Sequence, residues 1–305
     1  MESSHLFSST DIQEYEQNIS VIISIAPTII DQISREDTRA LKSLQRMFEG
    51  LSRSTSAETS EMLSFAIGKL YEKLNEPEKA IDYFRKYLEG EEQSHRGYGF
   101  HHLSVNLRRL LRWDEAIEYS RRAVRIKGDH RPCSYQGLGI NHMALGNFSQ
   151  ARKHYDKAIP DLLHDAEVFH HSSQNLVSLN RYSEALDHIK RSRSGKVNEI
   201  DVVAYQLTNC LIESICWLGL DRLDHYCSSL KSIKDTLSHL EPQKEVVDYF
   251  DFTWLPSLIP VNQINSLDPN ESLLDIYSAI GLRDQRISIS GLIDKLSVSI
   301  EMSCS

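Results

Sequence analysis

The stretch Tyr135–Pro160, YQGLGINHMALGNFSQARKHYDKAIP, carries the pattern that decides the fold. In its first half Leu138 and His142 are spaced as neighbours on one face of a helix, and in its second half Ala151 and Tyr155 repeat that spacing. Glycine and asparagine stand between the halves, and both residue types favour the end of a helix and a turn. The stretch therefore predicts two antiparallel helices that are joined by a tight turn.

The turn at the centre of this stretch recurs four times along the chain. Each copy has Leu, a ring-bearing residue three positions later, and Ala three positions after that. The copies are Leu74–Ala80, Leu110–Ala116, Leu145–Ala151 and Leu179–Ala185, and their alanines are 36, 35 and 34 residues apart. In three copies a polar residue precedes Ala by two positions, and we expect it to cap the second helix; these residues are Asp114, Ser149 and Ser183. Helix pairs that repeat at this period predict a stacked α-solenoid.

The third copy resembles the tetratricopeptide repeat family most fully. It has Leu138-Gly139, Ala151, Tyr155 and Pro160 at the family's positions, with His142 where Tyr is usual. The resemblance implies an all-α, right-handed superhelix of antiparallel helix pairs. It also implies that the first helix of each pair lines a concave groove, while the second helix belongs to the outer layer.

Three regions are expected along the chain. Residues 1–55 form an N-terminal helical cap, residues 56–240 form the repeats, and residues 241–305 form a C-terminal helical cap. The repeats are expected at about 61–94, 97–130, 132–165 and 166–199, followed by a degenerate pair at 200–239. The caps keep helical periodicity without the repeat phase, and they would cover the apolar edges that a solenoid exposes at its ends.

The composition is that of a globular protein without a membrane span. The chain has 305 residues with 34 Lys+Arg and 43 Asp+Glu, and its net charge of −9 argues against a protein that coats nucleic acid. The most apolar run, Ile19–Ile30, is too short to cross a bilayer, and Pro27 interrupts it. The five cysteines include no Cys-x-x-Cys pair, which predicts reduced thiols and a cytoplasmic location.

No signature of catalysis, of cofactor binding or of metal binding stands out in the sequence. Gly-x-Ser-x-Gly and phosphate-binding glycine motifs are absent. The thirteen histidines include the pairs His101-His102 and His170-His171, but adjacent helical residues point about 100° apart, so one pair does not chelate one ion easily. We expect no catalytic residue, no metal ligand and no cofactor, and a protein that is more typical of a non-enzyme than of an enzyme.

The family resemblance also implies where a ligand would lie. Members of this family contact ligands through fixed positions on the first helix of each pair, and these positions transfer to this chain by the repeat phase. The resulting concave strip consists of Phe65, Lys69, Tyr98, His101, Arg108, Arg109, Gln136, Ile140, His170 and Gln174.

Residues 96–131 are basic within an otherwise acidic chain. They hold nine Lys+Arg against four Asp+Glu, which is compatible with solvated helix faces, with an anion-binding site, or with a contact to the acidic residues 241–305. Arg108 and Arg112 are four apart, so we expect them on one helix face. An anionic peptide would meet Arg108 and Arg109, whereas Arg121 is expected on the outer layer.

The most economical interpretation is a non-catalytic scaffold or adaptor that captures a protein or peptide, including an anionic one, in the concave groove. Three alternatives stay open. The first is a regulator that resembles bacterial peptide-pheromone receptors but lacks a DNA-binding domain, and the second is an enzyme with its active site in the groove. The third is an RNA-binding helical repeat protein, which only the basic segment favours, so nucleic acid is the less expected partner. The sequence leaves the oligomeric state open.

Overall fold

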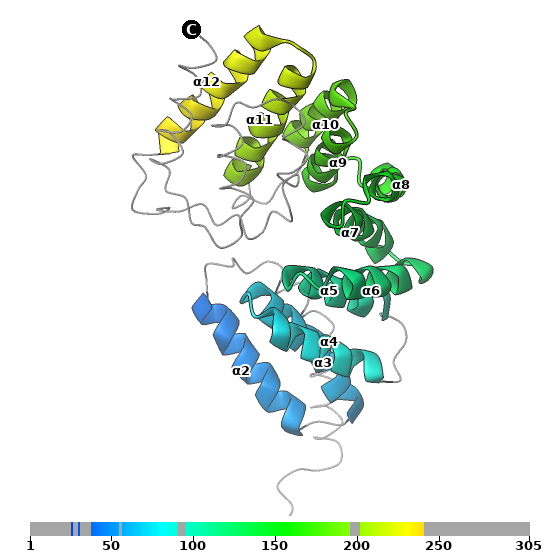
Figure 1. Cartoon of the computed structure of the whole chain (residues 1–305). Coiled ribbons are helices and arrows are strands. Elements are labelled where there is room, and N and C mark those ends of the chain that lie inside the picture. The colour runs from blue at the N-terminus through cyan, green and yellow to red at the C-terminus, as the bar shows by residue number, and fades with distance from the viewer. Residues whose placement is uncertain are drawn as a thin grey trace, which may run out of the picture. The chain divides into compact units, whose positions relative to one another are not determined.

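A computed structural model describes residues 26, 30, 38–54, 57–90, 96–195 and 202–240, and these residues form helices and turns with no β-strand (Figure 1). The all-α expectation is therefore confirmed. The predicted C-terminal cap and most of residues 1–37 lie outside the described residues. In chain order the helices are α2 (Thr38–Ser54), α3 (Ala57–Lys73), α4 (Pro77–Glu89), α5 (Arg96–Arg109), α6 (Trp113–Arg125), α7 (His130–Ala144), α8 (Phe148–Ala158), the short 3-10 helix η1 (Ile159–Asp161), α9 (Ala166–Ser178), α10 (Tyr182–Ser194), α11 (Val202–Gly219) and α12 (Leu223–Leu240).

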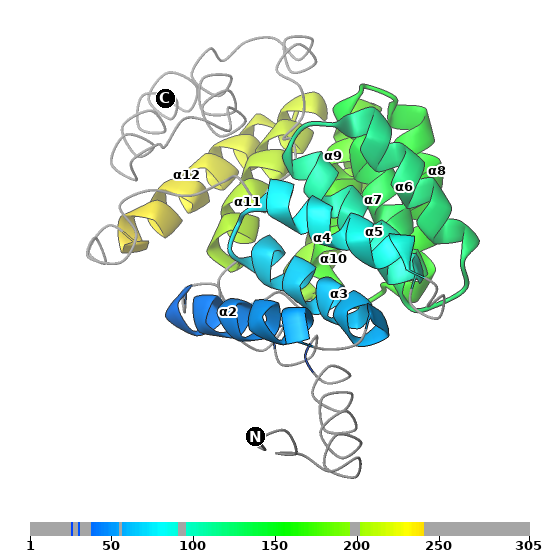
Figure 2. The same cartoon turned by 90° about the horizontal axis from the view of Figure 1, so that it is seen from below.

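The helices pack as consecutive antiparallel pairs, as the repeat pattern predicts. The pairs α3–α4, α5–α6, α9–α10 and α11–α12 have extensive contacts between their members (Figures 1 and 2). Neighbouring pairs also contact each other, since α4 packs on α5 and α10 packs on α11. This arrangement of stacked helix pairs is that of an α-solenoid.

One backbone turn joins the two helices of every pair. Its central residue has a positive φ, and these residues are Asn75 (58°), Leu111 (61°), Gly146 (73°), Asn180 (56°) and Asp221 (56°). In each turn this residue donates its N–H to the carbonyl three positions earlier, and the next residue donates to the carbonyl five positions earlier. This double hydrogen bond is the Schellman ending of a helix. The degenerate pair α11–α12 has the same turn as the four copies that the sequence pattern identified.

The capping expectation for Asp114, Ser149 and Ser183 is wrong. The second helices start earlier, with Arg112, Asn147 and Arg181 as N-caps, and none of these three side chains caps its helix. The three expected capping residues lie instead inside the first turn of the helix. The physical reason is that the positive-φ turn residue already sets the chain direction, so the helix begins at the ring-bearing residue that follows.

The chain divides into two compact units, Met1–Ser134 and Tyr135–Ser305, and the division falls within α7. In the first unit α2 packs on α3 through Leu41 and Phe48, which join a core that includes Leu70, Phe84 and Leu103. Apolar side chains of α2 thus cover part of the first repeat pair.

The core of the second unit surrounds the phenol ring of Tyr155, which is fully buried. A Cβ atom on Gly139 would lie 2.7 Å from this ring, closer than van der Waals contact allows. Gly68 has the matching place in the first unit, where a Cβ would lie 2.9 Å from the ring of Phe84. The small residues of the sequence pattern are therefore required by the close crossing of the two helices in a pair.

The cysteines differ from the sequence expectation at one position. Cys133, Cys210 and Cys216 are free thiols. Cys227 on α12 is disulfide-bonded, so the expectation of five reduced thiols is wrong at this residue. The cysteine content therefore gives no support to a cytoplasmic location.

Candidate ligand-binding face of the first unit

Helices α3 and α5 lie side by side in the first unit, and a half-buried carboxylate joins them. Glu72 on α3 accepts hydrogen bonds from Asn106 Nδ2 at 2.7 Å and pairs with His102 Nδ1 at 3.1 Å, both on α5. Arg109 Nη1 donates to the backbone carbonyl of Glu72 at 2.8 Å. These contacts fix the two helices relative to each other at the C-terminal half of α5.

The electrostatics of this network favour the ionised form of Glu72. Burial by itself would raise the pKa of the carboxyl, but His102, Arg109 and Asn106 stabilise the negative charge, and the net effect is a lowered pKa. A buried carboxylate is tolerated only when it is paired and hydrogen-bonded in this way. The network therefore acts as a structural clamp between α3 and α5.

Further along the face, α5 is linked to the first turn of α7. His101 Nδ1 lies 3.1 Å from Ser134 Oγ, and the rings of Tyr98 and His130 are in contact at a centroid distance of 5.0 Å. Burial, together with the charge of His102, lowers the pKa of His101 to about 3. His101 is consequently neutral at pH 7 and presents hydrogen-bonding nitrogens without a charge.

An aromatic group borders the face on α3. The half-buried ring of Phe65 contacts Phe84 and Tyr87 of α4 and His102 of α5, at centroid distances of 5.7, 5.2 and 5.6 Å. Rings at these separations stabilise one another in tilted or edge-to-face geometry. Phe65 is thereby held in one position while part of its surface stays accessible.

Of the ten residues in the predicted strip, six belong to the first unit. Phe65, Tyr98, His101, Arg108 and Arg109 are half-buried, while Lys69 is buried. Arg109 contributes to the α3–α5 contact through Glu72, so part of its hydrogen-bonding capacity is already used.

The four remaining strip residues, Gln136, Ile140, His170 and Gln174, belong to the second unit and are all buried. His170 Nδ1 lies 2.9 Å from Asn209 Oδ1, and Gln174 Nε2 lies 3.2 Å from His170 Nε2. Burial lowers the pKa of His170 to about 3, with a further lowering from the charge of His171. His170 and Gln174 thus belong to an internal polar network between α9 and α11, whereas Gln136 and Ile140 are buried on α7.

The expectation that Arg108 and Arg112 share a helix face is wrong. Helix α5 ends at Arg109, and Arg112 follows the positive-φ turn at Leu111, where it becomes the N-cap residue of α6. Its guanidinium forms two hydrogen bonds of 2.6 Å with the carboxylate of Glu115. Arg112 is therefore held at the turn and does not continue the helix face on which Arg108 lies.

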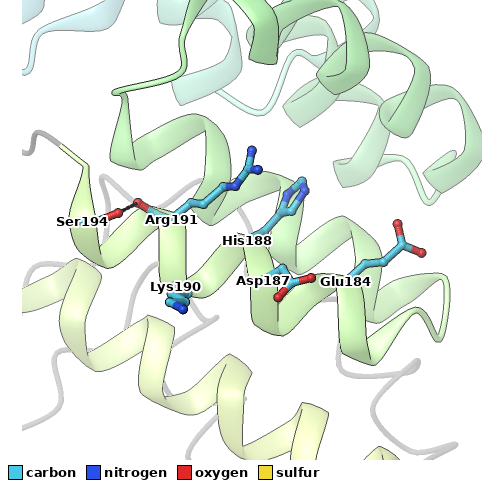
Figure 3. Close-up of a pocket in the computed structure, with 6 residues that line it drawn as sticks. All are labelled: Glu184, Asp187, His188, Lys190, Arg191 and Ser194. Carbon is cyan, nitrogen blue, oxygen red and sulfur yellow. Dashed lines mark hydrogen bonds between the residues drawn. The ribbon is translucent and has the colours of Figure 1, made fainter.

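An open pocket of about 530 Å³ lies on α10, at a site that the sequence did not indicate. The described residues that line it are Glu184, Asp187, His188, Lys190, Arg191 and Ser194 (Figure 3). Glu184, His188 and Arg191 project from one side of the helix (Figure 3). Burial lowers the pKa of His188 to about 4, with further lowering from Arg152 and Arg191. The only sequence signal for this pocket is the spacing of its polar residues along α10. Such spacing is common on solvated helices, so it does not predict a pocket.

The described part of the chain has neither a metal-binding cluster nor a membrane-spanning helix. No group of three or more His, Cys, Asp or Glu side chains there is arranged to hold a metal ion. No helix in that part has both the length and the apolar character needed to cross a membrane.

Comparison with known proteins agrees with this geometry. The family model of the tetratricopeptide repeat matches residues 63–91, which span most of α3 and α4. No curated protein matches the sequence significantly.

Three solved structures share the fold at low sequence identity. Pseudomonas aeruginosa pilF has a TM-score of 0.56 at 16% identity, over 75% of this chain and 98% of that chain. A chain of the APC/C hetero-tetramer Cut9-Hcn1 has a TM-score of 0.53 at 15% identity, over 86% of this chain and 52% of that chain. BtubC from P. vanneervenii has a TM-score of 0.50 at 15% identity, over 73% of this chain and 92% of that chain. Residues 63–91 therefore match a tetratricopeptide repeat, and the chain shares the stacked helix-pair fold of these three structures.

Proposed function

We propose that this chain is a non-catalytic scaffold whose first unit binds a peptide or a partner helix along α3 and α5. The observation that carries the proposal is a face that is both accessible and fixed. Phe65, Tyr98, His101 and Arg108 are half-buried on this face, and the contacts of Glu72 with α5 hold the helices beneath them. A fixed face binds a flexible ligand with little ordering cost on its own side.

The chemistry of the face suits a peptide that has an apolar side chain next to a negative charge. Phe65 offers the exposed part of a ring, and neutral His101 offers hydrogen bonds. Arg108 can bind a carboxylate through two parallel N–H donors. In the second unit His170 and Gln174 are better suited to holding α9 and α11 together, and Gln136 and Ile140 are buried as well. The proposed ligand site is therefore confined to the first unit.

The test is a peptide selection from a displayed random library against the full chain, followed by calorimetry with the selected peptide. Arg108→Ala and Tyr98→Ala should each weaken binding by roughly 1–3 kcal/mol, the scale of a lost charged hydrogen bond or aromatic contact. The melting temperature of the free Arg108→Ala variant should stay nearly unchanged. Lys86→Ala, which removes an exposed charge from α4, is the matched control and should retain the affinity. An equal loss in Arg108→Ala and Lys86→Ala would indicate diffuse electrostatics, and a loss confined to Lys86→Ala would refute the α3–α5 site.

A further inference from the structure

A cluster of cations, called the basic end below, gathers where α6 ends and where α5 and α7 begin. Because α5 and α6 are antiparallel, the start of one lies beside the end of the other. The guanidinium of Arg122 on α6 lies 4.2 Å above the ring centroid of Phe100 on α5, which documents this arrangement. At the start of α7, His130 Nε2 lies 3.1 Å from the carbonyl oxygen of Ala123 on α6. At the start of α5, Arg96 Nη2 donates to the carbonyl of Leu88 on α4 at 2.8 Å. The basic end consists of Arg96, Arg121, Arg122, Arg125, Lys127 and Arg131.

The structure separates the basic segment 96–131 into two parts with different roles. Arg109 and Arg112 are at the far end of α5, where they bind Glu72 and Glu115. The length of α5 is about 20 Å at 1.5 Å per residue, so the basic end is well separated from these two arginines. The excess positive charge of the segment is therefore concentrated at the end of α5 that is opposite to Arg108 and Arg109.

Three members of the basic end are exposed and form no ion pair with any described residue. These are Arg121, Arg125 and Lys127, of which Arg121 and Arg125 lie on one side of α6 because they are four residues apart. By contrast, Arg112 and Arg181 each form a bidentate pair with a glutamate three residues later. The described acids near the basic end are Glu89, Glu118 and Asp129, and all three are exposed.

The helix dipole accounts for only part of the cluster. Arg122 and Arg125 are in the last turn of α6, where a positive charge interacts favourably with the helix end. Arg121 lies before that turn, and Lys127 lies beyond the end of the helix. A purely structural role for the charges therefore leaves Arg121 and Lys127 unexplained.

We propose that the basic end is a second interaction surface, distinct from the α3–α5 face, that binds an acidic polypeptide segment of a partner protein. Unpaired guanidinium and ammonium groups on one helix end match carboxylates that are spaced along a peptide. A nucleic acid fits less well, because single-stranded binding relies on open aromatic surfaces for base stacking. Phe100 is only 5% exposed and is covered by Arg122, whose guanidinium also lies 5.4 Å from the ring centroid of Tyr119.

The test uses the full chain and a labelled peptide of ten glutamates, with binding followed by fluorescence anisotropy. The test variant is Arg121→Gln/Arg125→Gln/Lys127→Gln. The matched control is Lys153→Gln/Lys190→Gln/Lys231→Gln, which removes the same charge from exposed helix positions of the second unit. Three exposed pairs of about 0.5 kcal/mol each add up to about 1.5 kcal/mol, so the test variant should lose about tenfold in affinity. The control should lose less than about twofold, and added salt should weaken the wild-type complex.

Several outcomes would overturn the proposal. Equal losses in both triple variants would mean that the probe senses only net charge, and tighter binding of a ten-nucleotide uridine RNA would assign the surface to nucleic acid. If only Arg108→Ala weakens binding of the glutamate peptide, the peptide binds the α3–α5 face and not the basic end. Failure of this proposal is therefore distinguishable from failure of the proposed peptide site. If circular dichroism finds the test variant unfolded, Lys127→Gln replaces it, because this residue lies outside the helices; no loss there would refute the proposal.

Discussion

The turn at Leu111 holds a residue type that is poorly suited to its backbone. Leu111 has φ 61°, whereas the four equivalent turns use Asn75, Gly146, Asn180 and Asp221. The left-handed conformation costs a branched or bulky L-residue roughly 1–2 kcal/mol, and Asn and Gly tolerate it far better. We predict that Leu111→Asn stabilises the first unit.

The size of the effect follows from the surroundings of the side chain. Leu111 is 51% exposed, and it is absent from the side chains that pack against the core of the first unit. Little apolar burial is lost on replacement, so the net gain should be about 0.5–1.5 kcal/mol. Leu111→Gly should gain slightly less than Leu111→Asn, because glycine also adds freedom to the unfolded chain.

Urea unfolding measures this gain, with Trp113 two positions away as the fluorescent reporter in the first unit. Leu111→Ala is the control, because it removes the side chain but keeps a residue that disfavours a positive φ. Stabilisation by Ala equal to that by Asn would refute the backbone argument. Destabilisation by Asn would show that the side chain of Leu111 makes contacts that outweigh the strain.

Three further predictions concern packing and pH. Gly139→Leu should destabilise the second unit by about 1–3 kcal/mol or more, because its Cβ would meet Tyr155 at 2.7 Å; a wild-type melting curve would contradict the close crossing. Deletion of residues 1–55 should cause aggregation or dimerisation in light scattering, since it removes Phe48 from the core; a monomeric and equally stable product would make the segment dispensable. Lowering the pH from 7.5 to 5 should reduce the free energy of unfolding by about 2 kcal/mol through His170. The folded residue stays neutral because its pKa is about 3, whereas the unfolded residue gains a proton below pH 6.5. The stability difference between wild type and His170→Gln should shrink by that amount, and a pH-independent difference would refute the coupling.

Much of the repeat architecture follows from local pattern. The spacing of Ala80, Ala116, Ala151 and Ala185 gave the helix pairs in the correct phase, because a residue at a close helix crossing must be small wherever the pair occurs. The fifth pair was predicted only as degenerate, but the backbone of its turn at Asp221 is equivalent to the others. Backbone geometry is thus more uniform along the chain than the side chains that accompany it.

The candidate site depends more on the tertiary structure. The repeat period predicts one row of equivalent positions, and this row includes half-buried Tyr98 and His101 as well as fully buried His170 and Gln174. The repeat period indicates which side chains point in a similar direction, whereas their burial depends on which helix packs against them. In the second unit α11 contacts α9, and Asn209 provides a partner for His170.

By itself, the sequence determined the helix pairs, their turns and the small residues at their crossings, because these features depend on neighbours a few residues apart. Only the tertiary structure decided which charges are engaged. The basic segment 96–131 has one composition, yet Arg109 of α5 donates to the backbone carbonyl of Glu72 on α3, while Arg121 and Arg125 face solvent. A charge is neutralised by groups that the fold brings within a few ångströms, and linear composition does not record that distance.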